Sequence, residues 1–217
     1  MRTFLTAQQI AFFAQNGYIE LEGILPVQNQ VFSLARSVLE TRAGCALSRV
    51  PSPRLYLLGR DLWREQADLQ TILLKQLSKV ALSLTGKPLR LACDQWIPSE
   101  YVLAPLCSLK EIFSIQGLAL AAILCPKEII PSAKTSLGLL PLPKNPNGIL
   151  FFKPELLIDW PGLAKIASAE LYCVVYPRST AVYIHNSNDP TGNALKQMGY
   201  HFGDPLQNHL HPIIFPS

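Results

Sequence analysis

Imidazole side chains, which are common metal ligands, occur in this chain only from His185 onward. His209 and His211 are two residues apart, so on a strand both would project to the same face. Together with His201 and Asp204 they could form a site for a transition metal such as zinc, iron or copper. Prolines flank this segment and favour a surface loop, in which case the histidines would bind no metal.

His185 and Asp189 place an imidazole and a carboxylate at the end of a predicted strand. Such a pair could provide half of an acid–base system. The residues between them, 186–188, read Asn-Ser-Asn, and these side chains form Asx-type hydrogen bonds in turns. The pattern therefore favours a turn over a catalytic pair.

Motifs of several other reaction classes do not occur in the sequence. There is no Gly-x-Ser-x-Gly nucleophile elbow, no Cys/His signature, no CxxC pair and no glycine-rich phosphate-binding loop. Asp61, Glu65 and Asp68 lie close together on a predicted helix, and their charges indicate a solvated helix face. These patterns argue against nucleophilic catalysis and against nucleotide binding.

Composition allows a large core and limits the choice of partners. The chain is 49% hydrophobic and 16% charged, with a formal net charge of +4. Its basic residues are scattered, which disfavours nucleic acid as a partner without excluding it. The longest apolar run, Gly117 to Cys125, is too short to cross a membrane. The N-terminus does not read as a secretory signal, and five cysteines suggest reduced thiols, so we expect a cytoplasmic protein.

Apolar residues at helical spacing dominate the first part of the chain. They predict helices over residues 6–16, 26–39 and 60–84, and a short helix over 193–198. Thr6 and Gln9 have the types and spacing of a capping box at the first helix. Residues 41–59 contain Pro51 and Pro53 and are predicted to be irregular.

Strand patterns dominate the second part of the chain. The predicted strands are Tyr18–Glu22, Leu89–Ile97, Ile112–Leu124, Gly148–Phe152, Glu170–Tyr176 and Ala181–His185. The last two are predicted to form a hairpin closed by Pro177 to Thr180. Tyr200 to Phe202 is predicted to start another extended segment. Helices followed by strands favour an α+β fold with a sandwich or a barrel-like roll.

Three segments carry a resemblance to a known family. Leu5–Pro26 combines a Leu-Thr helix start, Asn-Gly-Tyr and an extended segment, and it resembles the N-terminus of the phytanoyl-CoA dioxygenase-like family. Leu84–Leu91, followed by Asp94-Gln95, resembles the exit of that family's long helix into its sheet. Asn147–Phe152 resembles a late strand of the same family.

The resemblance implies a fold and a domain organisation. It implies a double-stranded β-helix (jelly roll) with flanking N-terminal helices, as in Fe(II)/2-oxoglutarate-dependent oxygenases. We therefore expect a single domain over 1–217, with a mostly helical flank at 1–88 and a mostly β jelly roll at 89–217.

The chain departs from the family at the metal site. Members hold Fe(II) with two histidines and one carboxylate, which leaves positions for 2-oxoglutarate and oxygen. The first histidine would belong to a His-x-Asp motif soon after Asp94-Gln95, but residues 97–124 contain no histidine. The second would follow Gly148–Phe152, where residues 153–159 also contain none. We therefore expect no cofactor, with Fe(II) and 2-oxoglutarate as the alternative.

The same resemblance suggests a ligand pocket. Asp94 and Trp96 would face the mouth of the roll, and Arg178 is the nearest candidate to pair with a carboxylate, although it lies in a predicted turn. Trp63 and Trp160, like Trp96, could line a ligand pocket or fill the core, and the core is favoured.

Three functions remain open from the sequence. The favoured one is an oxygenase-like protein without the usual iron site, which is non-catalytic and binds a small molecule or a protein. The second is an active Fe(II)/2-oxoglutarate oxygenase that recruits other histidines as ligands. The third is a divalent-metal-responsive DNA-binding regulator, for which a helix-turn-helix and a basic stripe are missing.

Overall fold

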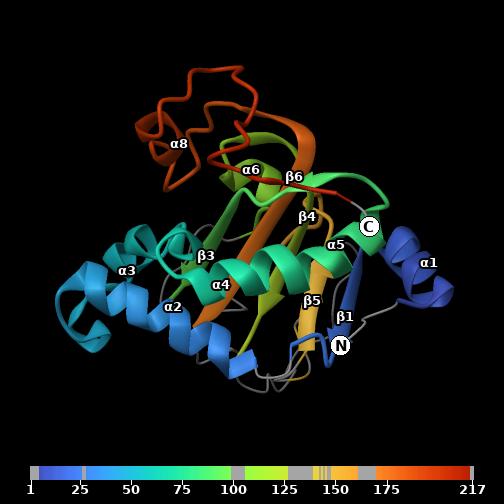
Figure 1. Ribbon diagram of the computed structural model, residues 1–217, viewed down its shortest axis with the longest axis horizontal. Helices are drawn as coiled ribbons and strands as arrows, with labels where there is room; N and C mark the ends of the chain where they lie inside the picture. Colours follow the sequence, from blue (N-terminus) through green and yellow to red (C-terminus); the bar gives the residue numbers. More distant parts are fainter. Residues whose placement is uncertain are drawn as a thin grey trace.

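Helices cover one face of an antiparallel sheet (Figure 1). The computed structural model describes residues 5–25, 28–98, 106–126, 139–141, 143, 145, 148–160 and 170–215. The expected α+β character is confirmed, because the helices and the strands pack together as separate layers. Within the described part of the chain, no helix has the length and apolar character needed to cross a bilayer.

The helices lie mainly in the first 85 residues. Their bounds are α1 Ala7–Asn16, α2 Gln28–Ala43, α3 Ser52–Leu58, α4 Ala67–Thr71, α5 Ser78–Thr85, α6 Leu109–Ile112 and α8 Ala194–Gln197. The predicted capping box is confirmed, since the backbone N–H of Gln9 donates to the Thr6 hydroxyl and the Gln9 side chain accepts from the Thr6 N–H. Gly17 ends α1 with a φ of 80°, in the left-handed region that glycine adopts at low cost.

Two segments outside the main helices matter for the site. The 3-10 turn η2 (Leu62–Arg64) precedes α4, and the π-helical segment η3 (Ile72–Leu77) joins α4 to α5. The predicted helix from Arg60 to Leu84 is therefore interrupted near its start and widened in its middle. The Tyr176 hydroxyl donates to the Leu73 carbonyl at 2.9 Å, and this bond stabilises the π turn from the sheet side.

The strands form one connected network. Their bounds are β1 Tyr18–Glu22, β2 Leu89–Arg90, β3 Cys93–Ile97, β4 Ile115–Leu124, β5 Gly148–Phe152, β6 Leu171–Tyr183 and β7 Ile213–Ile214. Their order is β1-β5-β4-β6-β2-β7, and β3 also pairs with β6. All these pairings are antiparallel, and β6 is the longest strand and has the most partners.

The predicted hairpin at Pro177 to Thr180 is wrong. These residues continue β6, which runs unbroken from Leu171 to Tyr183. Pro177 lies opposite Leu118, where the register with β4 shifts on both sides, and Gly117 has a φ of 95°. The irregularity in β4 accommodates the proline, which has no N–H to donate to the sheet.

Two further predictions need correction. Residues 52–58 form α3, because Pro51 and Pro53 lie in its cap and first turn, where proline is tolerated. Tyr200 to Phe202 is not a strand, since a turn begins at His201. The last strand lies instead at Ile213–Ile214 and pairs with β2.

Alternate residues of each strand contribute to two separate cores. Trp96, Tyr172 and Val174 pack toward the helices, in a core that also contains Phe32 and Leu73. The intervening residues belong to a second core that also includes residues from α6, α8 and the C-terminal segment. From the strands this core takes Cys93, Ile97, Ile115, Leu118, Ala121, Ile123, Leu150, Phe152, Leu171, Cys173, Val175, Ala181 and Tyr183. We call the side of the sheet that faces this second core the inner face.

Candidate functional site

A short segment before η2 extends the sheet beyond β3. Arg60 forms an isolated antiparallel bridge with Gln95. The Trp96 N–H donates to the Gly59 carbonyl at 2.8 Å, and the Asp61 N–H donates to the Asp94 carbonyl at 3.0 Å. Added to Gly59, a Cβ would lie 2.6 Å from Trp96 Cβ. Glycine therefore permits the close approach that places the next two residues, Arg60 and Asp61, at this edge.

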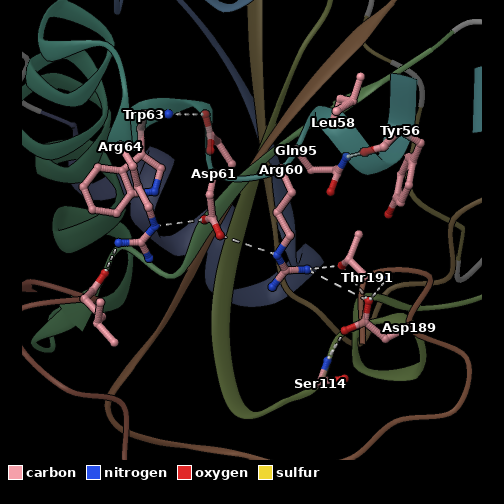
Figure 2. A network of polar contacts seen from close by, with 12 residues as sticks. Tyr56, Leu58, Arg60, Asp61, Trp63, Arg64, Gln95, Ser114, Asp189 and Thr191 are labelled. Atoms are coloured by element: carbon pink, nitrogen blue, oxygen red, sulfur yellow. Dashed lines mark hydrogen bonds and ion pairs between the residues drawn. The ribbon is translucent and has the colours of Figure 1, made fainter. Parts of the chain in front are cut away.

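Arg60 is a buried arginine at this edge of the sheet (Figure 2). Its Nη1 donates to the Thr191 hydroxyl and lies 4.0 Å from Asp189 Oδ1, and its Nε lies 3.8 Å from Asp61 Oδ2. The guanidinium also lies 5.6 Å from the centre of the Phe113 ring. Burial opposes its charge, but nearby acidic groups, first Cys93 and then Asp61 and Asp189, outweigh that effect and raise the pKa of Arg60.

Asp61 lies between two arginines. Its Oδ1 is 3.7 Å from Arg64 Nε, and its backbone has a φ of 60°, the one positive φ of a non-glycine residue in the described segments. Burial raises the pKa of Asp61, and Arg60 and Arg64 act against that rise. The prediction that Asp61 marks a solvated helix face is wrong, because the residue is only 7% exposed.

Arg42 on α2 donates hydrogen bonds to the backbone of the segment that carries Arg60 and Asp61. Its Nη1 donates to the carbonyls of Leu58 and Arg60 at 2.5 and 2.6 Å, and its Nη2 donates to the Asp61 carbonyl at 3.3 Å. Its side chain also forms an ion pair with Glu65 at 2.6 Å. Arg42 thus satisfies the carbonyls that a helix end and a turn leave without partners.

The opposite wall comes from the loop after β6. Asp189 accepts hydrogen bonds from the Ser114 N–H at 2.9 Å and from the N–H and hydroxyl of Thr191, both at 2.8 Å. Asn186 accepts from the Asn188 N–H at 3.0 Å. The predicted Asx-type turn after His185 is therefore confirmed, and it holds Asp189 and Thr191 against Arg60.

These two walls enclose a pocket of about 650 Å³, which we call the arginine pocket. Its lining residues are Arg42, Leu57, Arg60, Asp61, Arg64, Pro190, Thr191, Asn193, Ala194, Gln197 and Met198. Charged groups gather on the side of η2, and apolar and amide side chains come from Leu57 and the region of α8. Its volume lies in the range that small-molecule sites occupy.

Asp94 lies behind the pocket, on the helix side of the sheet. Its Oδ2 accepts from the Trp63 N–H at 3.1 Å and from the Tyr172 hydroxyl. Burial and the nearby Asp61 raise the pKa of Asp94 to about 7, and the two hydrogen bonds lower it. Burial also raises the pKa of Tyr172 well above its ordinary range.

The other two predicted pocket residues lie elsewhere. Trp96 is 1% exposed and packs against Phe32 on the helix side, with the Arg36 guanidinium 6.0 Å from its ring. Arg178 lies opposite Leu89 in β6 and is exposed, beside a small cavity of about 250 Å³. The structure thus brings Asp94 and Trp96 onto one face of β3, opposite Val174 and Tyr172, whereas Arg178 lies further along β6. All three tryptophans fill the core, as the sequence favoured.

The four histidines, all of which the structure describes, do not converge. His185, His201 and His209 are exposed, whereas His211 is buried, with Nδ1 2.9 Å from the Tyr200 hydroxyl. Burial, together with nearby arginines, lowers the pKa of His211 to about 3. Within the described residues, no three His, Cys, Asp or Glu side chains are grouped to hold a metal ion. The His201, His209 and His211 set therefore does not form a metal site in this structure.

Comparison with solved structures identifies the fold. The chain is similar to the non-heme alpha ketoglutarate dependent carbocyclase SnoK from nogalamycin biosynthesis, with 15% identity, 97% of each chain covered and a TM-score of 0.65. It is also similar to the non-heme alpha ketoglutarate dependent epimerase SnoN of the same biosynthesis, with 17% identity, 97% and 96% covered and a TM-score of 0.61.

A third similar structure is that of CytC3 with Fe(II) and alpha-ketoglutarate, with 12% identity, 82% and 79% covered and a TM-score of 0.54. No family model matches the chain. No curated protein matches it either. The chain therefore has the fold of Fe/2-oxoglutarate-dependent oxygenases, and at these identities the likeness shows the fold alone.

The strand residues of the inner face are mostly apolar. From β3, β4, β5 and β6 the second core takes aliphatic and aromatic side chains and two thiols. The polar side chain added there by β3, Gln95, donates to the Tyr56 and Trp96 carbonyls at 2.7 and 2.9 Å. Among the described residues, these strand positions carry neither an imidazole nor a carboxylate, the groups that hold Fe(II) in sites of two histidines and a carboxylate.

The arginine pocket was not predicted from the sequence patterns. Arg42 lies in the segment predicted to be irregular, Arg64 lies in a predicted helix, and Thr191 lies between predicted elements. The one useful signal was Gly59-Arg60-Asp61, a glycine and two opposite charges between apolar stretches. Its meaning depends on the bridge to Gln95, which is distant in sequence.

Proposed function

We propose that this chain is a non-catalytic protein with the oxygenase fold, which binds a small molecule in the arginine pocket. The observation that carries the proposal is the combination of an inner face filled with apolar side chains and a pocket with charged walls at its edge. Among the described residues, the strand positions of the inner face carry no imidazole or carboxylate, whereas the pocket presents guanidinium, hydroxyl and amide groups to a ligand.

The proposal includes the finer features of the fold. We take the strands to form a double-stranded β-helix, because the antiparallel sheet has a packed core on each face. We take residues 1–217 as one domain, because the helix-side core joins Phe13 on α1 to Tyr176 on β6. The helical flank also supplies β1, which pairs with β5 in the same sheet.

Binding to the pocket is tested by screening a fragment library with backbone-amide NMR. We expect fragments that shift the amide signals of Thr191, Ala194 and Met198. Met198→Trp should abolish these shifts because the indole occupies the pocket, and Ala194→Met serves as a second blocking variant. Phe215→Trp, at a position that is 67% exposed and outside the pocket lining, should leave them unchanged. A screen in which no fragment shifts these signals would overturn the proposal.

A further inference from the structure

We infer that the arginine pocket is built for a hydroxy carboxylate with an apolar substituent. This inference rests on the proposed function and names the class of its ligand. The carboxylate would lie against Arg60 and Arg64, the hydroxyl against Asp61, and the apolar substituent against Leu57 and Met198.

The first argument concerns hydrogen-bond donors without partners. Nε of Arg60 and both Nε and Nη2 of Arg64 are buried and have no hydrogen-bond partner, although the Arg60 side chain is only 5% exposed. The ion pairs to Asp61 and Asp189, at 3.7 to 4.0 Å, are longer than hydrogen bonds. Nη1 of Arg60 donates to the Thr191 hydroxyl and Nη1 of Arg64 donates to the Leu210 carbonyl, so the groups that still lack an acceptor are these three N–H positions, and buried donors are normally paired. A carboxylate offers two oxygens with the geometry that arginine binds well.

The second argument concerns an acceptor in the same pocket. Oδ1 of Asp61 is also buried, and its ion-pair partner, Arg64 Nε, lies 3.7 Å away, beyond hydrogen-bond distance. A plain carboxylate between the arginines would face this oxygen and be repelled by it. If the ligand also carries a hydroxyl, that group can donate to Asp61 while its carboxylate accepts from the arginines. The unpaired atoms of the pocket therefore match a ligand with both groups.

The third argument concerns the rest of the lining. On α3, Leu57 lines the pocket and is 56% exposed. Pro190, Ala194 and Met198 line it from the segment around α8. These side chains provide apolar surface, which contributes affinity in small-molecule sites. Asn193 and Gln197 add amide groups to the lining. An apolar substituent on the hydroxy carboxylate would bury this surface, which an inorganic anion would leave exposed.

Charge alone does not select an anion in this pocket. Arg42, Arg60 and Arg64 are matched by carboxylates at Glu65, Asp61 and Asp189. Recognition would therefore depend on hydrogen bonds that are unmade in the free protein. For this reason the test compares ligands of the same shape that differ in one group.

Three matched probes separate these contributions: mandelate, phenylacetate, which lacks the hydroxyl, and mandelamide, which lacks the charge. Titrations of the full chain by calorimetry should show mandelate binding at about millimolar Kd, as expected for a ligand of this size. Phenylacetate and mandelamide should bind about tenfold more weakly, since each loses a hydrogen bond to a charged group.

Variants show whether the binding uses the pocket. Arg64→Gln should weaken mandelate and phenylacetate about tenfold and leave mandelamide unchanged. Met198→Trp should abolish binding of all three probes. Arg36→Gln is the matched control, because Arg36 is an exposed arginine paired with Glu170 outside the pocket lining, and it should change nothing. If Arg64→Gln does not fold, the ranking of the three probes on the wild-type chain decides the inference.

The outcomes separate this inference from the proposed function. Equal affinity for the three probes, or no mandelate binding while library fragments still bind in the pocket, would overturn the hydroxy carboxylate and leave the proposed function standing. Absence of any pocket ligand in both experiments would overturn both.

Discussion

Tyr172 on β6 donates its phenolic hydrogen to the carboxylate of Asp94 on the neighbouring strand β3, in the core between sheet and helices. Both side chains are fully buried, and Asp94 accepts a second hydrogen bond from the Trp63 N–H. The Asp94 carboxylate therefore contacts both β6, through the Tyr172 hydroxyl, and η2, through the Trp63 N–H. η2 is the turn that carries Arg64. The arginine pocket is thus connected to the core through Asp94.

The raised pKa of Asp94 predicts how stability depends on pH. The pKa is about 7 in the folded chain against 3.8 in the unfolded chain, so between these values the folded state holds a proton that the unfolded state has released. Stability from this group is fully present below pH 3.8 and is lost as pH rises through 7. Relative to Asp94→Asn, the wild type should lose roughly 3 kcal/mol of unfolding free energy between pH 4 and 7, measured by urea unfolding. A pH-independent difference between the two proteins would contradict this assignment.

His211 should act in the opposite direction. Its pKa is lowered from 6.5 to about 3, so between these values the unfolded chain binds a proton that the folded chain does not. Stability from this group is present above pH 6.5 and is lost as pH falls through 3. We expect the His211 ring signal in NMR to remain that of a neutral imidazole at pH 5. In the urea-unfolded chain the same signal should titrate near 6.5, and titration near that value in the folded chain would disprove the prediction.

Gly59→Ala should displace the segment that carries Arg60. The new Cβ would lie 2.6 Å from Trp96 Cβ and 3.0 Å from two backbone oxygens, so the segment must move away from β3. Overpacking of this kind costs about 1–3 kcal/mol. Gly44→Ala is the control, because Gly44 has a φ of 66° but nothing within 4 Å of a new Cβ, so it incurs only the left-handed cost of about 1 kcal/mol. An unfolding free energy for Gly59→Ala no lower than that of the control would show that close approach is not required.

Tyr176→Phe should destabilise the π turn. The variant leaves the Leu73 carbonyl without its side-chain donor in the helix-side core, at a cost of about 1–3 kcal/mol. Hydrogen exchange should rise first in η3, while β6 remains protected. Tyr18→Phe, at a half-buried position, is the control and should change stability by about 0.5 kcal/mol or less. Equal effects of the two variants would mean that the hydroxyl does not stabilise the turn.

Local chemistry explains which parts of the fold could be predicted from the sequence. The capping box of Thr6 and Gln9 and the strands Tyr18–Glu22 and Gly148–Phe152 depend on neighbouring residues, and the structure confirms them. β6 was split into two strands because Pro177 looks like a turn residue. In the structure Pro177 continues the strand, because the irregular part of β4 near Gly117, which is distant in sequence, pairs with it without needing an N–H from the proline.

Most of the site depends on contacts that sequence patterns do not display. Asp61 has the same type and spacing as exposed helix residues, but the bridge between Arg60 and Gln95 places it at the edge of the sheet, where it is buried. Trp96 was expected at a pocket mouth, yet its place in the alternation of β3 directs it to the helix-side core. Histidine content was informative, because a residue type that is missing before His185 cannot be supplied by folding.

The most direct test of the central claim, an oxygenase fold whose described inner-face strand positions carry no imidazole or carboxylate for iron, is an anaerobic titration of Fe(II) with 2-oxoglutarate present, followed by calorimetry. CytC3, whose structure contains both, is the positive control. For this chain we expect no saturable heat from either component and no succinate after oxygen is admitted. Binding of both at micromolar Kd, with succinate release, would contradict the account and favour an active oxygenase with another set of ligands.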